Sequence, residues 1–368
     1  MEPTPLEVEI RRRIAKAGPM SVRQYMTDCL THPLYGYYMT RDPLGRSGDF
    51  VTAPEISQVF GELVGLWAAS AWHLMGQPEN VRLVELGPGR GTMMLDALRA
   101  AQVVPAFRAA IVVHLVEISP VLRERQQTAL GAIDVPVMWH ETFEDVPEGP
   151  VIILANEFVD ALPVNQAIKQ INGWYERVVE IDAAGHLAFG ISDEQIPLFE
   201  QLLPPQVRDA PLGSIFEWRG DHLALAIGQR VVSQRGAALL IDYGHVESAV
   251  GETLQAVGGH AFANPLETPG QVDLTAHVDF QAFALAAERM GARTFGPVDQ
   301  ARFLLNLGVE KRALALKAYV PREKGEEIDV AVKRLLGEDR GEMGKLFKAI
   351  AFAHPDLGDL PGFEPESP

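Results

Sequence analysis

Short apolar runs alternate with helix-like stretches along the chain from Val81 onward. Each apolar run ends at polar or turn-forming residues, as is typical of strands that are buried on both faces of a sheet. The stretches Thr92–Ala101 and Pro120–Leu130 between them carry apolar residues at helical spacing. This alternation predicts an α/β fold with a mostly parallel sheet and helices on both of its faces. The candidate strands are Arg82–Leu86, Ala110–Val116, Val135–Trp139, Val151–Ala155 and Ala237–Asp242.

The segment before the first strand has helical patterns separated by a loop. Helices are predicted at Leu6–Ala17 and Ser21–Leu30, because Gly18-Pro19 breaks the pattern between them. The stretch His32–Pro54 is too rich in Gly, Pro and Tyr for regular structure, and a lid-like loop is expected there. A further helix, expected to lie in the core, is predicted at Glu55–Met75 from its apolar periodicity.

The regular alternation is interrupted after the fourth strand. Paired strands are predicted over Gln166–Ser192, and the proline-rich stretch Glu194–Gly220 is expected to form short helices and loops. Helices follow at Asp279–Met290 and Gln300–Leu307. The predicted organisation is an N-terminal helical addition with its loop (1–80), a Rossmann-like domain (81–164 and 236–320), an α+β insertion (165–235) and a C-terminal helical segment (321–368).

The first strand runs into a glycine-rich turn that reads LVELGPGRGT. Glu85 ends the strand, and glycines follow at Gly87, Gly89 and Gly91. A turn of this kind before a helix presents bare backbone and a positive helix end to a ligand, which predicts a nucleotide-type site. The dinucleotide-binding pattern G-x-G-x-x-G, begun at Gly87, would require a glycine at position 92, where the chain has Thr92. The observed spacing G-x-G-x-G therefore favours S-adenosylmethionine (SAM) over NAD as the ligand. Glu85 is a candidate for holding the methionyl ammonium group of SAM.

Two further positions are candidates for the nucleoside half of the ligand. Glu117 ends the second strand, where a carboxylate can accept hydrogen bonds from both ribose hydroxyls. This position suits SAM and NAD equally, and an exposed acid at a strand end is the alternative. Phe143, after the third strand, is a candidate for facing the adenine.

Acidic and amide side chains gather where the fourth strand ends, in the sequence ILANEFVDALPV. Asn156, Glu157 and Asp160 fall at the carboxyl edge of the predicted sheet, where ligands bind in open α/β folds. Methyl transfer needs an aligned acceptor and the removal of a proton, so carboxylates here suit a cationic acceptor such as arginine. The alternative is that Asp160 caps a turn and Glu157 is a solvated acid. Glu55 and Glu62 lie seven residues apart on one face of the helix predicted after the loop, and they are further candidates for lining this site. The alternative is that this face of the helix is solvated.

Composition narrows the classes of partner. The chain has 49 Asp and Glu against 32 Lys and Arg, a net charge of -17, which disfavours nucleic acid and favours a basic protein substrate, although solubility alone also explains it. The single cysteine, Cys29, excludes an internal disulfide and a cysteine-based metal site, and no histidine spacing suggests a metal. No signal peptide, transit peptide or membrane span is expected, so a cytoplasmic location is predicted.

Several segments together resemble the MidA family of SAM-dependent methyltransferases over about residues 33–307. They are GDFVTAPEISQVFGELVGLW, VELGPGRGT, ILANEFVDALPV, LLIDYGH and DLTAHVDF, in this order. The family includes a mitochondrial assembly factor that methylates an arginine of a core subunit of respiratory complex I. The resemblance implies a class I methyltransferase fold that binds SAM and yields S-adenosylhomocysteine. It also implies that Glu85, Gly87, Gly89, Gly91 and Glu117 contact SAM, while Thr52, Glu55, Asn156, Glu157 and Asp160 border the reaction cleft.

These features predict a SAM-dependent methyltransferase that acts on a protein, with arginine as the favoured acceptor. The enzyme is expected to be a bacterial protein located in the cytoplasm. Two alternatives stay open: a non-catalytic assembly factor that keeps the nucleoside fold as a binding platform, and a methyltransferase for small molecules. The sequence is also compatible with a homodimer.

Overall fold

The computed structural model describes residues 2–45, 48–259, 261–339 and 341–365. The chain divides into two units, each assembled from separate stretches of sequence. Unit 1 comprises Met1–Phe50, Val159–Asp221 and His245–Ala282, and unit 2 comprises Val51–Phe158, His222–Gly244 and Phe283–Pro368. The residue boundaries that the sequence suggests for an addition, an insertion and a C-terminal segment stay predictions.

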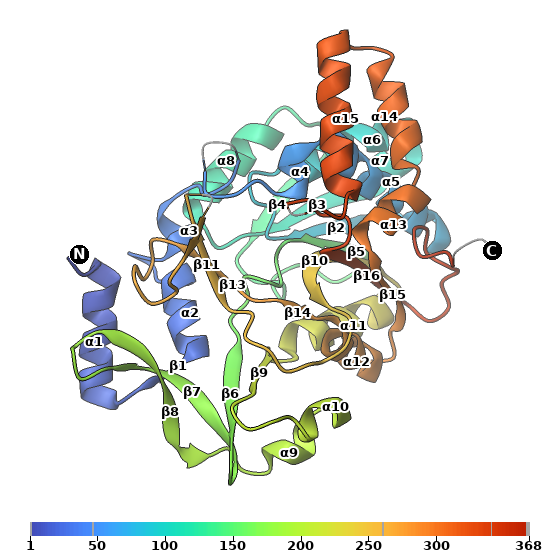
Figure 1. Cartoon of the computed structure of the whole chain (residues 1–368). Helices are drawn as coiled ribbons and strands as arrows, with labels where there is room; N and C mark the ends of the chain where they lie inside the picture. The colour runs from blue at the N-terminus through green and yellow to red at the C-terminus, as the bar shows by residue number, and fades with distance from the viewer. Residues whose placement is uncertain (1, 46–47, 260, 340, 366–368) are drawn as a thin grey trace. The chain divides into compact units, whose positions relative to one another are not determined.

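Unit 2 is built around a mixed, mostly parallel sheet (Figure 1). All five candidate strands are present, as β2 (Val81–Leu86), β3 (Ile111–Val116), β4 (Val137–His140), β5 (Val151–Asn156) and β10 (Ala237–His245). Neighbours among them pair in parallel, so their carboxyl ends meet at one edge. The antiparallel strands β15 (Arg293–Asp299) and β16 (Phe347–Ala353), which the sequence pattern did not reveal, extend the sheet beyond β10 in the order β15-β16-β10-β5-β2-β3-β4.

Helices pack against this sheet, and the last two of them along the chain form a helical hairpin. The helices of unit 2 are α4 (Ala53–Ile56), α5 (Gln58–Leu74), α6 (Thr92–Ala100), α7 (Pro105–Ala110), α8 (Pro120–Leu130), α11 (His222–Ser233), α13 (Gln300–Asn306), α14 (Val309–Lys317) and α15 (Arg322–Leu336), with a 3-10 turn at Ala101–Val103 and α12 (Phe280–Arg289) entering from unit 1. The buried core joins α5 and α6 to alternate residues of β2, β3, β5, β10 and β16. Helices α14 and α15 lie side by side in orange and red in Figure 1.

The predicted helix Glu55–Met75 is wrong at its beginning. Its first turn is the separate helix α4, and α5 starts only after Ser57. The backbone of Ser57 is extended, with φ -155° and ψ 130°, and its hydroxyl accepts a hydrogen bond from the backbone N–H of Val59. This side-chain cap begins a new helix. The expectation that the helix lies in the core is confirmed, since Trp67 and Trp72 are buried.

Unit 1 combines the N-terminal helices with small antiparallel sheets. Its helices are α1 (Pro5–Ala17), α2 (Val22–Thr31), α3 (Tyr37–Thr40), α9 (Phe199–Leu202) and α10 (Pro205–Arg208). One sheet contains β1 (Met20–Ser21), β6 (Asn165–Gln170), β7 (Gly173–Ile181), β8 (Leu187–Gln195) and β9 (Ile215–Trp218), and another contains β11 (Gln255–Gly258), β12 (Ala261–Ala263) and β13 (Asp273–Thr275), followed by the short β14 (Val278–Asp279). The predicted strand pairs after the fourth strand are confirmed. The stretch Glu194–Gly220 contains short helices as expected, and also the strand β9.

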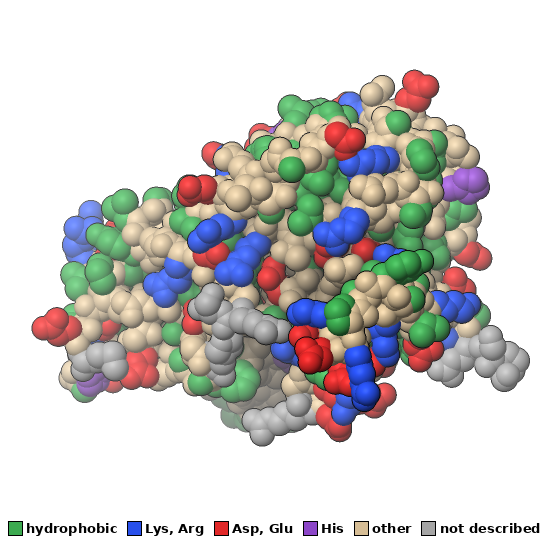
Figure 2. All heavy atoms as spheres, turned by 90° about the horizontal axis from the view of Figure 1, so that it is seen from above, with side chains coloured by type: hydrophobic (Ala, Val, Ile, Leu, Met, Phe, Trp, Pro, Cys, Tyr) green, Lys and Arg blue, Asp and Glu red, His purple; other side chains and the backbone are tan. Residues whose placement is uncertain are grey.

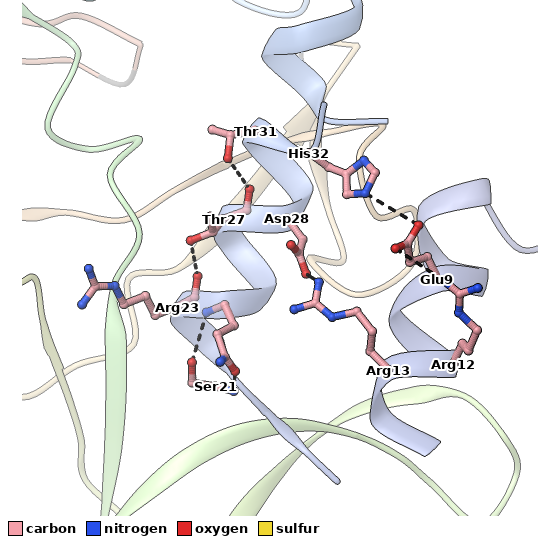
Figure 3. A network of polar contacts seen from close by, with 10 residues as sticks. Glu9, Arg12, Arg13, Ser21, Arg23, Thr27, Asp28, Thr31 and His32 are labelled. Carbon is pink, nitrogen blue, oxygen red and sulfur yellow. Dashed lines mark hydrogen bonds and ion pairs between the residues drawn. The ribbon is translucent and has the colours of Figure 1, made fainter. Parts of the chain in front are cut away.

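Polar contacts hold the two N-terminal helices together. Arg13 of α1 forms an ion pair with Asp28 of α2, and Glu9 lies 3.6 Å from the imidazole Nε2 of His32 (Figure 3). Ser21 begins α2 with a reciprocal capping box. The two helices predicted from the Gly18-Pro19 break are therefore confirmed and are fixed to each other within unit 1.

The described surface is mixed in charge on the face drawn in Figure 2, where Lys and Arg side chains lie among those of Asp and Glu. No helix within the described ranges is long and apolar enough to cross a membrane. Nor do the residues that the structure describes include three or more His, Cys, Asp or Glu side chains grouped to hold a metal ion.

Candidate functional site

The turn after β2 has the backbone that its glycines predict. Gly87, Gly89 and Gly91 all have positive φ, at 61°, 54° and 81°, a region that other residues rarely adopt. A Cβ atom at Gly87 would lie 2.5 Å from a ring carbon of Phe158. Gly91 then occupies the position before the first residue of α6. The chain therefore turns sharply from the carboxyl end of β2 into the N-terminus of a helix, a geometry that suits an anionic or nucleotide-type ligand.

Glu85, two residues before the turn, has a buried carboxyl group that the protein does not fully satisfy. The residue is 2% exposed, and its Oε2 atom has no hydrogen-bond partner among the described residues. Burial raises the pKa of Glu85 to about 8, and the nearby Glu117 acts in the same direction. A buried, unpaired carboxyl group favours either a proton or a cationic partner.

Glu117 follows β3 at the same sheet edge and is held by defined hydrogen bonds. Its Oε1 atom accepts from the backbone N–H of Ser119 at 2.8 Å, and its Oε2 atom accepts from Nε2 of Gln126 at 3.1 Å. Burial raises the pKa of Glu117, while these two hydrogen bonds lower it. The carboxylate is therefore oriented by the protein and is not an exposed strand-end acid, since it is 7% exposed.

Gln126 was missed in the sequence although it contacts two of the predicted site residues. It lies on α8, and its Nε2 atom also donates to the carbonyl oxygen of Gly89 at 2.7 Å. The available signal was a polar residue at helical spacing between the buried Leu122 and Leu130. Such a position faces the interior, and a buried amide needs partners there.

Glu55 is bound to the glycine turn. Its Oε1 atom accepts a hydrogen bond from the hydroxyl of Thr92, and its Oε2 atom lies 3.8 Å from a guanidinium nitrogen of Arg90. Glu62, which the sequence placed on the same helix face, is instead 1% exposed and bidentate to Arg312 of α14. The break at Ser57 separates the two acids, so Glu62 belongs to the core and not to the site.

Asn156 and Glu157 lie at the end of β5 and join α4 to the sheet edge. Glu157 has a φ of 50°, and its Oε1 atom accepts from the backbone N–H of Ala53 at 2.9 Å and from Nδ2 of Asn156 at 3.1 Å. The Oδ1 atom of Asn156 is buried without a hydrogen-bond partner among the described residues. Thr52, which precedes α4, accepts the backbone N–H of Glu55 through its carbonyl oxygen. The structure thus brings Thr52, Glu55, Asn156 and Glu157 together with the glycine turn in unit 2.

Asp242, which lies in β10 three residues before the strand ends, supports the same edge. Its Oδ2 atom accepts the backbone N–H of Phe158 at 3.2 Å, and its Oδ1 atom accepts that of Tyr243 at 2.9 Å. Because Phe158 approaches Gly87, this carboxylate fixes the chain segment that follows Glu157.

Asp160 falls in unit 1 and is not grouped with the other predicted site residues. It is 5% exposed, and its Oδ1 atom accepts the backbone N–H of Ala161. Its segment is fixed by Arg219, whose guanidinium donates to carbonyl oxygens of Asp160, Leu162, Ala276 and His277 at 2.6–3.0 Å.

The side chain of His277 is a separate case. Burial lowers the pKa of its imidazole, which favours a packed, neutral role for that side chain.

Phe143 lies in the turn after β4, and the residue is 5% exposed. The guanidinium carbon of Arg230 lies 5.2 Å from the ring centroid, and Arg230 also donates to the carbonyl oxygen of Phe143. One face of the ring is therefore covered by a cation, and contact with an adenine stays a prediction.

The parallel sheet, the positive-φ glycine turn and the acids at successive strand ends define an α/β protein with the fold of SAM-dependent methyltransferases. A crystal structure from Burkholderia thailandensis, bound to S-adenosylhomocysteine, agrees with a TM-score of 0.84 and 31% identity over 98% of this chain and 97% of that one.

Sequence comparison identifies the family. The family described as "Putative S-adenosyl-L-methionine-dependent methyltransferase" matches residues 63–298. A Drosophila melanogaster protein named protein arginine methyltransferase NDUFAF7 homolog, mitochondrial, is 37% identical over 97% of this chain and 88% of its own length. The human protein arginine methyltransferase NDUFAF7, mitochondrial, is 35% identical over 95% of this chain and 83% of its own length. The chain belongs to this methyltransferase family, and the resemblance to MidA proteins is confirmed.

Proposed function

We propose that this protein is a SAM-dependent methyltransferase whose acceptor is an arginine side chain of another protein. The observation that carries the proposal is the buried, unpaired Oε2 atom of Glu85 beside three positive-φ glycines that lead into α6. The names of the Drosophila and human relatives support arginine as the acceptor. The relative from Burkholderia that is bound to S-adenosylhomocysteine supports SAM as the cofactor.

Unit 2 offers groups that fit each part of SAM. Glu85 would hold the ammonium group, because a cation satisfies its orphaned oxygen and favours its ionised form. The backbone of the glycine turn would lie against the methionyl chain, and Glu117 would accept hydrogen bonds from the ribose hydroxyls. When bound, SAM supplies an electrophilic methyl group on a sulfonium centre, and S-adenosylhomocysteine is the product.

The acids around α4 suit a cationic acceptor. Glu157 and Glu55 present carboxylates near the glycine turn, and Asn156 has an unused acceptor atom. An arginine guanidinium stays charged in water and pairs with carboxylates in fixed, planar geometry. We assign Glu157 to orienting the acceptor and to taking the proton that the guanidinium group loses during methyl transfer. The net charge of -17 favours a basic polypeptide over other acceptors.

Two measurements test the proposal. Isothermal titration should detect binding of SAM and of S-adenosylhomocysteine, and tight NAD binding without SAM binding would falsify the assignment. Transfer of labelled methyl from SAM to proteins of a lysate that lacks this chain should then label one basic polypeptide. A core subunit of respiratory complex I, which the MidA resemblance implies, is the first to examine.

Variants separate catalysis from binding. Glu157→Gln should abolish labelling while leaving SAM affinity within about threefold of the original. Glu124→Gln, at an exposed position of α8, is the matched control and should leave labelling unchanged. SAM binding with no label in a competent lysate would indicate a non-catalytic binding platform. Label confined to low-mass compounds would indicate a small-molecule methyltransferase.

A further inference from the structure

Gln126 is a fully buried amide that connects three separate segments of unit 2. Its relative exposure is 0%, and both polar atoms of its side chain have partners. Nε2 donates to the carbonyl oxygen of Gly89 at 2.7 Å and to Oε2 of Glu117 at 3.1 Å, while Oε1 accepts from the indole N–H of Trp139 at 3.0 Å. A single side chain therefore joins the glycine turn, the acid after β3 and the strand β4.

The orientation of this amide follows from its partners. The indole nitrogen of Trp139 can only donate, so the oxygen of the Gln126 amide must face it. The NH₂ group then faces two acceptors, the carbonyl of Gly89 and the carboxylate of Glu117. A reversed amide would set donor against donor and acceptor against acceptor, so the arrangement has one stable orientation.

This orientation favours the ionised form of Glu117 and fixes its direction. The hydrogen bond from Gln126 favours the ionised carboxylate and opposes the rise in pKa of Glu117 that burial causes. Because Ser119 occupies Oε1 and Gln126 occupies Oε2, the remaining lone pairs of the carboxylate have fixed directions. An ionised carboxylate of fixed direction is what recognition of a vicinal diol requires.

We propose that Gln126 is a positioning residue for the nucleoside half of the cofactor, which acts by orienting Glu117 toward the ribose hydroxyls and by tying it to the glycine turn. This inference rests on the proposed function, because it assumes that SAM is bound with its ribose at Glu117. The Nε2 partners of Gln126 are distant in the sequence: Gly89 is 37 residues away and Glu117 is 9 residues away.

The test combines protein variants with two ligands. Dissociation constants are measured by titration calorimetry for S-adenosylhomocysteine and for its 2′,3′-dideoxy analogue, which lacks the hydroxyls that Glu117 would bind. Gln126→Ala removes all three hydrogen bonds. Gln126→Glu keeps the shape and the acceptor for Trp139 but sets a carboxylate against Glu117. Gln127→Ala, at the exposed neighbouring position of α8, is the matched control.

Both Gln126 variants should weaken S-adenosylhomocysteine binding about ten- to a hundredfold, since a hydrogen bond to a charged group is lost and Glu117 is left misdirected. They should weaken the dideoxy analogue less than about threefold, so that the preference for the hydroxylated ligand nearly disappears. Gln127→Ala should retain the original affinities and preference. Thermal unfolding identifies any variant that fails to fold, and Gln126→Glu, with nearly the same shape, then carries the test.

The outcomes are distinguishable. If the original protein binds and the Gln126 variants weaken both ligands equally, the side chain is only structural and the inference is wrong. Unchanged affinity in both variants overturns it as well. If the original protein binds neither ligand, the proposed function fails, and this inference falls with it.

Discussion

Replacing Glu85 by glutamine is expected to change the stability of this protein and its affinity for the cofactor in opposite directions. The substitution keeps the shape of the side chain and removes its ionisable proton. The pKa of Glu85 is raised by burial from an ordinary 4.5 to about 8, so at neutral pH without ligand the folded protein keeps a proton that the unfolded chain releases. We therefore expect Glu85→Gln to stabilise the ligand-free protein and to weaken its binding of SAM.

The magnitude follows from the two pKa values. Below pH 4.5 the carboxyl is protonated in both states, and between pH 4.5 and about 8 only the unfolded chain releases its proton, so rising pH favours unfolding. Above pH 8 both states are ionised and the full penalty, about 5 kcal/mol at about 1.4 kcal/mol per pKa unit, has developed. From pH 5 to pH 8 the penalty grows by about 3.5 kcal/mol, which for a chain of this length corresponds to about 4 °C in Tm.

Two assays test this expectation. Thermal unfolding at pH 5 and pH 8 should show the Tm advantage of Glu85→Gln over the original protein rising by about 4 °C. Calorimetry at pH 7 in buffers of different ionisation enthalpy should show that the original protein releases about one proton on binding S-adenosylhomocysteine. Glu85→Gln should release correspondingly less and bind about ten- to a hundredfold more weakly, because a charge-assisted hydrogen bond is lost. A Tm difference that is independent of pH, together with unchanged affinity, would refute the reasoning.

Three further substitutions test other parts of the structure. Gly87→Ala should weaken S-adenosylhomocysteine binding more than tenfold in calorimetry, because its Cβ would lie 2.5 Å from the ring of Phe158 at a φ of 61°. Arg312→Met should destabilise unit 2 by about 3 kcal/mol in urea unfolding, since it leaves the carboxylate of Glu62 buried without its cationic partner. Arg219→Met should destabilise unit 1 by about 2–4 kcal/mol, because four backbone carbonyls each lose a hydrogen bond from the guanidinium group, while cofactor affinity stays unchanged.

Each of these expectations has a control. Gly76→Ala shares a positive φ of 87° but meets no atom within 4 Å, so it should reduce stability slightly and leave affinity intact. If it impairs binding as much as the change at Gly87, close packing is not the cause. Glu62→Gln combined with Arg312→Met should recover at least half of the lost stability, and no recovery would argue against a buried unpaired charge. A loss of cofactor affinity in Arg219→Met would contradict the assignment of the cofactor-binding residues to unit 2 alone.

Runs of apolar residues and the spacing of glycines in the sequence were enough to predict the parallel strands and the glycine turn. Strands buried on both faces leave continuous apolar runs, so β2, β3, β5 and β10 were visible from the order of apolar residues alone. The edge strand β4 is only partly buried, but it too follows an apolar run between turn residues. The turn was visible because positive φ is a property of single residues, and glycine adopts it without steric penalty. Glu85 and Glu117 were found for the same reason, since each directly ends or follows a recognisable strand.

The partners of these side chains were decided only by the tertiary structure. The ion pair of Glu62 with Arg312 joins residues 250 positions apart, and the contact of Gln126 with Gly89 joins residues 37 apart. The helical period placed Glu62 beside Glu55, but the cap at Ser57 breaks the helix, and the apolar periodicity continues across the break without a sign of it. Asp160, only three residues after Glu157, belongs to the other unit. The sequence by itself thus determined which residues form strands and turns, because those preferences are local. The path of the chain decided which polar groups meet, because a buried donor or acceptor takes whichever partner packing brings within about 3 Å.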